Sequence, residues 1–290
     1  MSFKHELEGK HDIMKKIKLS DIIIRVPLIL YSVIVIFPML WTAATSLKTN
    51  QEFYMNPWAL PAKPQWINYV RAWYAADISK YFVNSLFVTT FSILVSILLA
   101  STSAYVLARF DFKLNKLITA LYVAGLMVPG MLTIIPTFFL LQDLHMYNSL
   151  IGLSFVYISR TLPFSMTVLI GFFKTLQREI EEAALIDGCG YFRTFWSVML
   201  PLARPGVITI SIFNFLYYWN EFELALTFIP DKGKSTLTVG MQSLMQVAQY
   251  RTDWGALFAG LMIVMVPTII IYTIFEGYIT EGLSAGAVKG

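Results

Sequence analysis

Six long apolar segments restrict the folds that this chain of 290 residues can adopt more than any other feature. About 20 mostly apolar residues are enough for a helix to cross the hydrocarbon of a bilayer. Two of the six contain charged residues: Ser149–Phe173 contains Arg160, and Gly206–Pro230 contains Glu221 and Glu223. The other four are uncharged: Val26–Leu47, Asn84–Leu107, Leu117–Gln142 and Trp254–Phe275. The pattern predicts an all-α membrane protein with six transmembrane helices.

The overall composition agrees with a membrane environment. The chain is 57% hydrophobic and only 14% charged, whereas a soluble domain contains about 25% charged residues. A large soluble core would need more polar cover than the short connecting segments offer. The bilayer is therefore the expected solvent for most of the chain.

The distribution of Lys and Arg predicts the orientation. With the N-terminus inside the cell, the inside segments carry about twice as many Lys and Arg as the outside segments, which favours this topology. The first apolar segment is too long for a signal peptide and is expected to be a retained helix. We expect a cytoplasmic N-terminal segment, residues 1–25, a six-span domain, residues 26–278, and a cytoplasmic C-terminal tail, residues 279–290.

Two of the expected outside segments are long enough to have structure of their own. Asn50–Lys80 contains three prolines and three tryptophans, and prolines at this density prevent long helices. The second, Asp231–Asp253, begins with a turn and continues into a predicted short helix around Val239–Ala248. We find no linker, low-complexity stretch or internal repeat, so a single domain is expected.

Several kinds of site are absent from the sequence. A single cysteine, Cys189, and three scattered histidines provide no metal-ligand spacing. Gly233-Lys234-Ser235-Thr236 resembles part of a phosphate-binding loop, but the first glycine of that motif is replaced by Phe228. No basic run is interleaved with aromatics, so nucleic acid is not expected as a partner. The chain is therefore not expected to be an enzyme or to hold a cofactor.

The polar segment 177–206, between the fourth and fifth apolar segments, contains the pattern E-A-A-x3-G-x9-V-x-L-P from Glu182 to Pro201. Gln177–Ile186 has strong helix formers with an apolar side and an acidic side that includes Glu181. Gly188 and Gly190 predict the end of this helix and a turn. A second helix is expected from Tyr191 to Met199, ending before Pro201.

This spacing resembles the EAA loop of type I ABC importer permeases, with every fixed position matched. In that family the two short helices and the glycine turn form a coupling element that docks in a cleft of the ATP-hydrolysing subunit. The resemblance implies partners: a second permease subunit, two ATPase subunits that bind ATP and Mg, and an extracellular solute-binding protein. It also implies a bacterial inner-membrane location. The docking residues implied are Glu181, Glu182, Ala183, Ala184, Asp187, Gly188, Leu200 and Pro201.

Further short motifs resemble the carbohydrate-uptake branch of the family. They are Asn84-Ser85-Leu86, Ala104–Arg109, Leu162-Pro163-Phe164, Trp219–Phe222 and the terminal Gly282–Gly290. Six spans without a large outside insertion is similar to the smaller permease of maltose-type systems. The resemblance implies a subunit that moves sugar or oligosaccharide into the cell.

Glu221 is the intramembrane residue that most needs an explanation, because a carboxylate in a bilayer is costly and usually faces protein or water. By helical rise, Glu221 lies about 12 Å and Arg160 about 16 Å from the outer ends of their spans, so the two are a possible ion pair. Alternatively, Glu221 belongs to a sugar path. The candidate residues for the path or the pair are Arg160, Asn214, Tyr218, Trp219, Asn220 and Glu221.

Two rival functions are weighed. Import of another solute, such as glycerol phosphates, would favour a cluster of buried cations, and only Arg160 is available. An ion-coupled secondary carrier would use intramembrane carboxylates such as Glu221, but it would not explain the EAA loop.

Pro129-Gly130, Pro136 and Pro163 interrupt the backbone hydrogen bonds of their spans and predict kinks, hinges or cavity positions.

Overall fold

The computed structural model describes residues 19–251 and 253–287, and these residues form helices and loops without a strand. The all-helical prediction is confirmed for this part of the chain. Most of the predicted N-terminal segment 1–25, and the last three residues of the predicted tail, lie outside the described residues.

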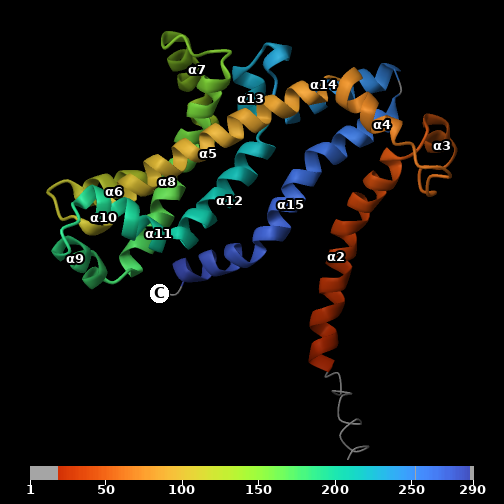
Figure 1. Ribbon diagram of the computed structural model, residues 1–290. Helices are drawn as coiled ribbons and strands as arrows, with labels where there is room; N and C mark the ends of the chain where they lie inside the picture. Colours follow the sequence, from red (N-terminus) through yellow and green to blue (C-terminus); the bar gives the residue numbers. More distant parts are fainter. Residues whose placement is uncertain (1–18, 252, 288–290) are drawn as a thin grey trace, which may run out of the picture.

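Long helices provide the frame (Figure 1). Four are long and apolar enough to cross a membrane, and there are up to six spans if each of two bent helix pairs counts as one. The four helices are α2 (Leu19–Ser46), α5 (Ile78–Arg109), α8 (Leu150–Thr175) and α15 (Trp254–Ala287). The bent pairs are Asn115–Gly125 with Gly130–Asp143, and Tyr191–Leu202 with Arg204–Asn220.

The centre of the fold is the long contact between α5 and α8. Small residues repeat every fourth position along α5, which places them on one face of the helix. Ser92, Ser96, Ala100 and Ala104 are all fully buried. Small side chains let neighbouring helices approach closely, which is the main source of attraction between helices in a bilayer. This face fixes α8, and α12 (Arg204–Asn220) also packs on both helices.

The predicted third span is broken. α6 (Asn115–Gly125) is separated from the short η2 (Gly130–Thr133) and α7 (Ile134–Asp143), and the two parts are bent by 103°. Pro129 is extended, with ψ 123°, and a proline disfavours helical backbone in the residue before it. The predicted interruption of the backbone at the Pro129-Gly130 pair is therefore confirmed, and the bend is sharp.

The predicted fifth span, Gly206–Pro230, is also broken. α12 ends at Asn220, Glu221 is extended with ψ 136°, and α13 (Glu223–Phe228) continues the chain as a separate short helix. Glu221 accepts hydrogen bonds from the backbone N–H groups at the start of α13, and a carboxylate in this position stabilises a new helix start.

Both expected outside segments contain helices. The first has no long helix before Ile78, as its prolines predicted, and the second contains the predicted helix. The first holds α3 (Asn50–Met55), α4 (Ile67–Val70) and the π-helix η1 (Arg71–Ala75). The second holds η4 (Lys232–Lys234) and α14 (Leu237–Arg251), which includes the predicted helix around Val239–Ala248.

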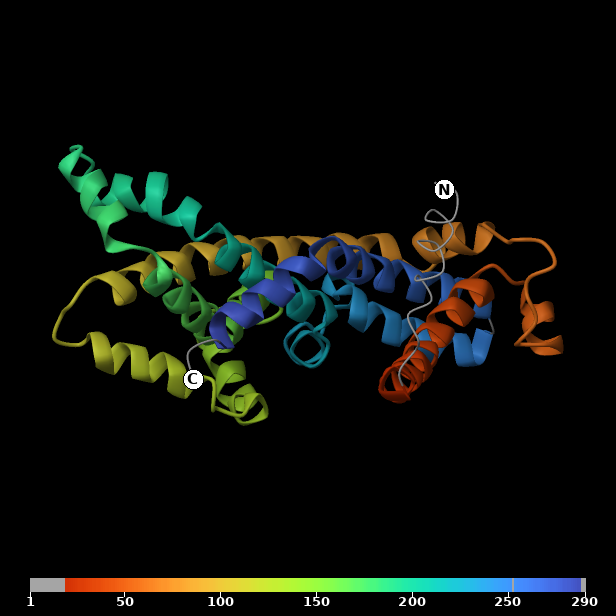
Figure 2. The same cartoon turned by 90° about the horizontal axis from the view of Figure 1, so that it is seen from below.

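The molecule has two distinct ends. One end holds α9 (Arg178–Ile186), α10 (Tyr191–Thr194), the π-helix η3 (Phe195–Met199) and α11 (Leu200–Leu202). The first turns of α2 and the last turns of α15 lie toward the same side, whereas α7, α13 and α14 lie on the opposite side (Figure 1). Viewed from below, the molecule is elongated, with α9 and α10 at one tip and α3 at the other (Figure 2).

Candidate functional site

The turn that ends α9 is set by Gly188. Its φ is +83°, in the left-handed region that glycine adopts without strain. The Gly188 N–H donates to Leu185 O at 3.1 Å, and the Cys189 N–H donates to Ala184 O at 3.0 Å. This pair of bonds is the common glycine-terminated end of a helix, so the predicted end of the first loop helix is confirmed.

The second loop helix is longer than predicted. It runs without interruption from Tyr191 through η3 to Leu202, so Pro201 lies within it rather than beyond its end. The wide π-turn just before Pro201 provides room for a ring that would clash in a regular α-helix. Phe195 and Met199 on η3 are buried in an apolar cluster with α5 and α8, and they anchor this helix to the frame.

Glu181 points into the protein and not toward the acidic side predicted for α9. Its carboxylate accepts a hydrogen bond from the Tyr105 hydroxyl at 2.5 Å and lies 3.3 Å from Arg109 Nε. The Arg109 and Glu181 side chains are only 4% and 11% exposed. Arg109 also donates to Leu176 O at 2.9 Å. These contacts hold α9 on the end of α5, so Glu181 is a positioning residue and has little surface for a partner.

Most of the other predicted docking residues are exposed together with apolar side chains that the sequence argument did not select. Ile186 is 86% and Phe192 78% exposed. Exposed apolar patches on a protein often mark a contact with a partner. Seven of the exposed residues around the glycine turn are called the loop surface here: Glu182, Ala183, Ile186, Asp187, Gly188, Tyr191 and Phe192. In the sequence, the aromatic pair Tyr191-Phe192 directly after the glycine turn could have indicated this exposed apolar surface.

The remaining predicted docking residues lie behind or beside this surface. Ala184 is buried on the inner side of α9, and Leu200 is half-buried against the same cluster as Phe195. Pro201 is exposed, on the far part of the second helix. Ala184 and Leu200 therefore pack the two loop helices against the protein, whereas Pro201 is exposed on the second of them.

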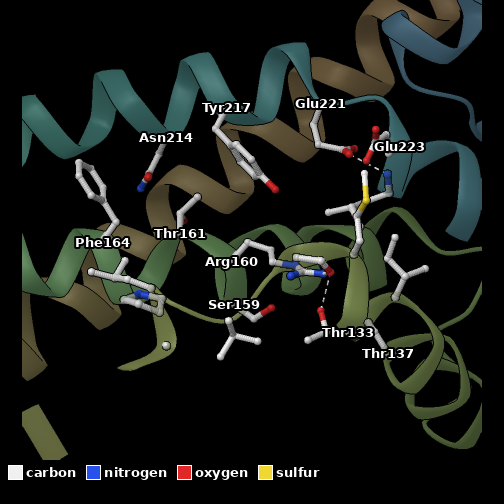
Figure 3. A pocket seen from close by; sticks show the side chains of 18 of the residues that line it. Thr133, Thr137, Ser159, Arg160, Thr161, Phe164, Asn214, Tyr217, Glu221 and Glu223 are labelled. Atoms are coloured by element: carbon white, nitrogen blue, oxygen red, sulfur yellow. Dashed lines mark hydrogen bonds between the residues drawn. The ribbon is translucent and has the colours of Figure 1, made fainter. Parts of the chain in front are cut away.

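Away from the loop surface, a cavity of about 1050 Å³ opens between the middle of α8, the end of α12 and the broken segment of α6, η2 and α7. The break in the predicted third span forms one wall, and the residues around the end of α12 form another. Asn214 and Tyr217 point from α12 toward α8, where Arg160 and Phe164 lie (Figure 3). The Glu221 carboxylate, just after the end of α12, turns toward the start of α13. The cavity thus combines aromatic surfaces with amide, hydroxyl, carboxylate and guanidinium groups.

Arg160 and Glu221 line this cavity without forming the predicted pair. In the part of the chain that the structure describes, no ion pair joins them. Arg160 donates to Gly130 O at 2.7 Å, across the break between α6 and η2. Glu221 accepts from the Tyr157 hydroxyl at 2.6 Å and from the N–H groups of Leu224 and Ala225 at 2.7 and 3.0 Å. Glu221 therefore caps the start of α13, whereas Arg160 holds the backbone carbonyl of Gly130 at the break after α6.

The other predicted path residues divide into two groups. Asn214 and Asn220 line the cavity, and Asn214 also donates to Ser96 Oγ at 3.1 Å. Tyr218 and Trp219 do not line it. Tyr218 is buried against Tyr157, with stacked rings 5.5 Å apart, and its hydroxyl bonds to that of Thr161.

Trp219 is likewise a packing residue. It is 2% exposed, stacks on Phe215 at 5.6 Å between ring centres, and donates through Nε1 to Val264 O at 3.1 Å. The prediction missed Tyr157, whose partner Glu221 is 64 residues away along the chain. The two residues lie on different predicted spans, so no spacing within one segment pairs them.

Known proteins resemble this chain along most of its length. Residues 92–284 match the family described as the binding-protein-dependent transport system inner membrane component. The chain is 43% identical over 262 residues to the diacetylchitobiose uptake system permease protein NgcG of Streptomyces coelicolor, covering 90% of this chain and 87% of that protein. It is 31% identical over 280 residues to the trehalose/maltose transport system permease protein MalG of Thermococcus litoralis, covering 96% of this chain and 100% of that protein.

A solved structure shares the fold. The crystal structure of a bacterial ABC transporter involved in the import of the acidic polysaccharide alginate matches with a TM-score of 0.81 and 19% sequence identity, covering 91% of this chain and 98% of that chain.

Proposed function

Because the chain belongs to the family of binding-protein-dependent transport system inner membrane components, we propose that it is the permease subunit of an ATP-driven importer of sugar or oligosaccharide. The observation that carries the proposal is the cavity between the middle of α8 and the end of α12. Its lining offers flat aromatic faces and paired polar groups, which is the combination that binds sugar rings and hydroxyls. Tyr217 and Phe164 supply aromatic surface, and Asn220 and Glu221 supply polar groups.

The charges of the cavity favour a neutral sugar over an anionic solute. Arg160 is the one cation among the described lining residues, against the carboxylates of Glu221 and Glu223. A phosphate would meet net negative charge there, and it would find a guanidinium that already bonds to Gly130 O. Glycerol phosphates are therefore the weaker candidate, as are solutes with several negative charges.

The loop surface is the proposed docking site for the ATP-hydrolysing subunit. Its apolar residues, Ile186, Tyr191 and Phe192, are exposed in this chain, and burying them against a partner is favourable. Glu182 and Asp187 add carboxylates that can pair with basic groups of the partner. The contacts of Glu181 with Arg109 and Tyr105 carry force from this surface into α5, which lines the centre of the fold.

The whole transporter is proposed to contain a second permease subunit, two ATPase subunits with ATP and Mg²⁺, and an extracellular solute-binding protein. The loop surface and both termini face the cytoplasm. Closure of the ATPase pair brings the loops together and reorients the helices around the cavity.

A cysteine at Ser284, with Cys189 replaced by serine, tests whether the C-terminal tail faces the cytoplasm. It should resist membrane-impermeant thiol reagents in intact cells and react after lysis.

Transport measured in proteoliposomes tests the function. The chain is co-expressed with its partner subunits, and uptake is followed for diacetylchitobiose, maltose, trehalose and glycerol phosphate. We expect ATP-dependent uptake of at least one sugar. Tyr217→Ala should raise the KM for that sugar by roughly tenfold, whereas the control Tyr272→Ala, outside the cavity lining, should not. Uptake that needs an ion gradient and not ATP would identify a secondary carrier instead.

A matched pair of variants tests the docking site. Ile186→Asp places a charge in the loop surface, and Leu60→Asp does the same at an equally exposed position in the segment between α3 and α4 (81% exposed). Ile186→Asp should weaken co-purification of the ATPase subunits by roughly tenfold or more, because apolar burial is lost. Leu60→Asp should leave it unchanged. Equal effects of the two variants would contradict the assignment.

A further inference from the structure

A second large pocket lies at the loop end of the molecule and is strongly basic. It has a volume of about 970 Å³ and is formed by the end of α5, the start of α6, the end of α8 and the start of α9. Its charged lining residues are Arg109, Asp111, Lys113, Lys116, Lys174 and Arg178. Five of these six are cations, and of these only Arg109 also takes part in the contacts that hold α9 on α5. None of the six lines the sugar cavity.

Four of the five cations have no partner in the described part of the chain. Arg109 is engaged with Glu181 and Leu176 O. No hydrogen bond or ion pair of Lys113, Lys116, Lys174 or Arg178 side chains occurs there, and all four are exposed. A single carboxylate, Asp111, opposes them in the lining. The pocket therefore has an excess of positive charge available to an anion.

An apolar groove continues directly from this pocket. It has a volume of about 490 Å³ and shares Asn115, Lys116 and Lys174 with the basic pocket. From there it follows one face of α6, which is lined successively by Thr119, Ala120, Val123, Ala124 and Met127.

The groove belongs to the outer surface of the helix bundle. α6 lies at the edge of the molecule (Figure 2), and none of its residues is buried. A Cβ on Gly125 would lie 3.2 Å from Pro163 Cγ, so the far end of α6 is close to α8. The groove is thus open at Lys116 and Lys174 and narrows toward Gly125.

The dimensions fit one leaflet of a bilayer. Lys116 and Ala124 are separated by about 12 Å along α6, with Met127 just beyond the end of the helix, and half of the hydrocarbon core measures about 15 Å. A ligand with an anionic head in the basic pocket and an apolar tail along α6 would fill both spaces at once. We propose that this site binds an anionic phospholipid, with its phosphate between Lys116 and Lys174 and one acyl chain in the groove.

A lipid accounts for both halves of the site, and other anions account for only one. A free phosphate would be attracted by the lysines but would leave the groove empty. Basic pockets between transmembrane helices on the cytoplasmic side are typical sites for anionic head groups. The bound lipid would connect α6 to the start of α9, next to the coupling element, and would make transport depend on the lipid of the inner leaflet.

Native mass spectrometry and binding of a fluorescent phosphatidylglycerol to the full chain in mild detergent test the proposal. Lys116→Gln with Lys174→Gln should weaken binding by about thirtyfold. The matched control, Lys63→Gln with Lys232→Gln, removes two exposed lysines elsewhere and should change nothing. Ala120→Phe fills the groove and should also displace the lipid. Binding should weaken as salt rises.

Three outcomes would overturn the proposal. Phosphatidylcholine that binds as tightly as phosphatidylglycerol would mean a nonspecific lipid shell. Soluble glycerol phosphate that binds as tightly as the lipid, and is insensitive to Ala120→Phe, would mean a free phosphate site. Loss of the ATPase subunits from the Lys116 and Lys174 double variant, with lipid binding retained, would assign the lysines to protein docking.

Discussion

The loop end and the cavity end of this protein each contain a carboxylate bonded to a tyrosine, yet the two are satisfied in different ways. Glu181 accepts from Tyr105 at 2.5 Å and pairs with Arg109. Glu221 accepts from Tyr157 at 2.6 Å and has backbone N–H groups where Glu181 has a cation. The first arrangement joins the loop to α5, and the second holds open a break between α12 and α13.

This difference separates two structural tasks. An ion pair between separate elements resists their separation, so Glu181 and Arg109 make α9 move with the end of α5. A carboxylate that caps a helix stabilises a local change of chain direction, so Glu221 shapes the cavity rim without tying it to Arg160. A loop that is held to α5 suits the proposed coupling role, and polar groups at the rim suit the proposed sugar cavity.

Breaking the ion pair at the loop end should have the largest effect. Arg109→Met leaves the buried Glu181 carboxylate without its cation, and we expect a loss of about 3–5 kcal/mol of stability. Thermal unfolding of the detergent-solubilised protein measures it. Adding Glu181→Gln should recover part of the loss, because an absent pair costs less than an unpaired buried charge. Equal stability of the single and double variants would contradict this role.

The corresponding change at the cavity end should cost less. Glu221→Gln retains an acceptor but loses the charge that strengthens its bonds, so we expect about 1.5–3 kcal/mol. Combining it with Arg160→Gln should give additive losses within about 0.5 kcal/mol, as for independent sites. Recovery of stability in the double variant would revive the Arg160–Glu221 ion pair.

The two ends also terminate their helices differently. α9 needs a left-handed residue at Gly188, whereas α12 ends in extended backbone at Glu221. Gly188→Ala should therefore cost about 1–2 kcal/mol, although the space around it is open. It should also weaken ATP-driven uptake. Gly190→Ala is the control, because Gly190 has a φ of −71° that alanine adopts freely. Identical unfolding temperatures for the two variants would argue against a backbone role.

The smallest effects are expected from removing one tyrosine hydroxyl at each end. Tyr105→Phe and Tyr157→Phe should each cost about 0.5–1.5 kcal/mol, because each carboxylate keeps its other partners. Only Tyr105→Phe should also lower ATPase stimulation by transport substrate, since Tyr105 helps to hold the loop. An effect of Tyr157→Phe on ATPase stimulation, measured in proteoliposomes, would mean that the cavity end also transmits motion.

The sequence by itself determined the features that depend on neighbouring residues. Uncharged apolar runs defined the membrane segments, and Gly188 marked the end of α9. The pattern from Glu182 to Pro201 indicated the family. Two predicted spans nevertheless break, one at Pro129-Gly130 and one at Glu221, because a mean apolar character specifies the bilayer and not a continuous helix.

Only the tertiary structure decided which partner each polar group finds. Glu181 lies in the same helix turn as the exposed Glu182, yet it turns inward because Tyr105 and Arg109, from a helix more than 70 residues earlier, are within reach. Arg160 bonds to a carbonyl freed by the break at Gly130, and so does not pair with Glu221. Lys116 and Lys174 share one pocket because α6 and α8 run side by side. These contacts join residues far apart along the chain, and therefore local periodicity and spacing cannot predict them.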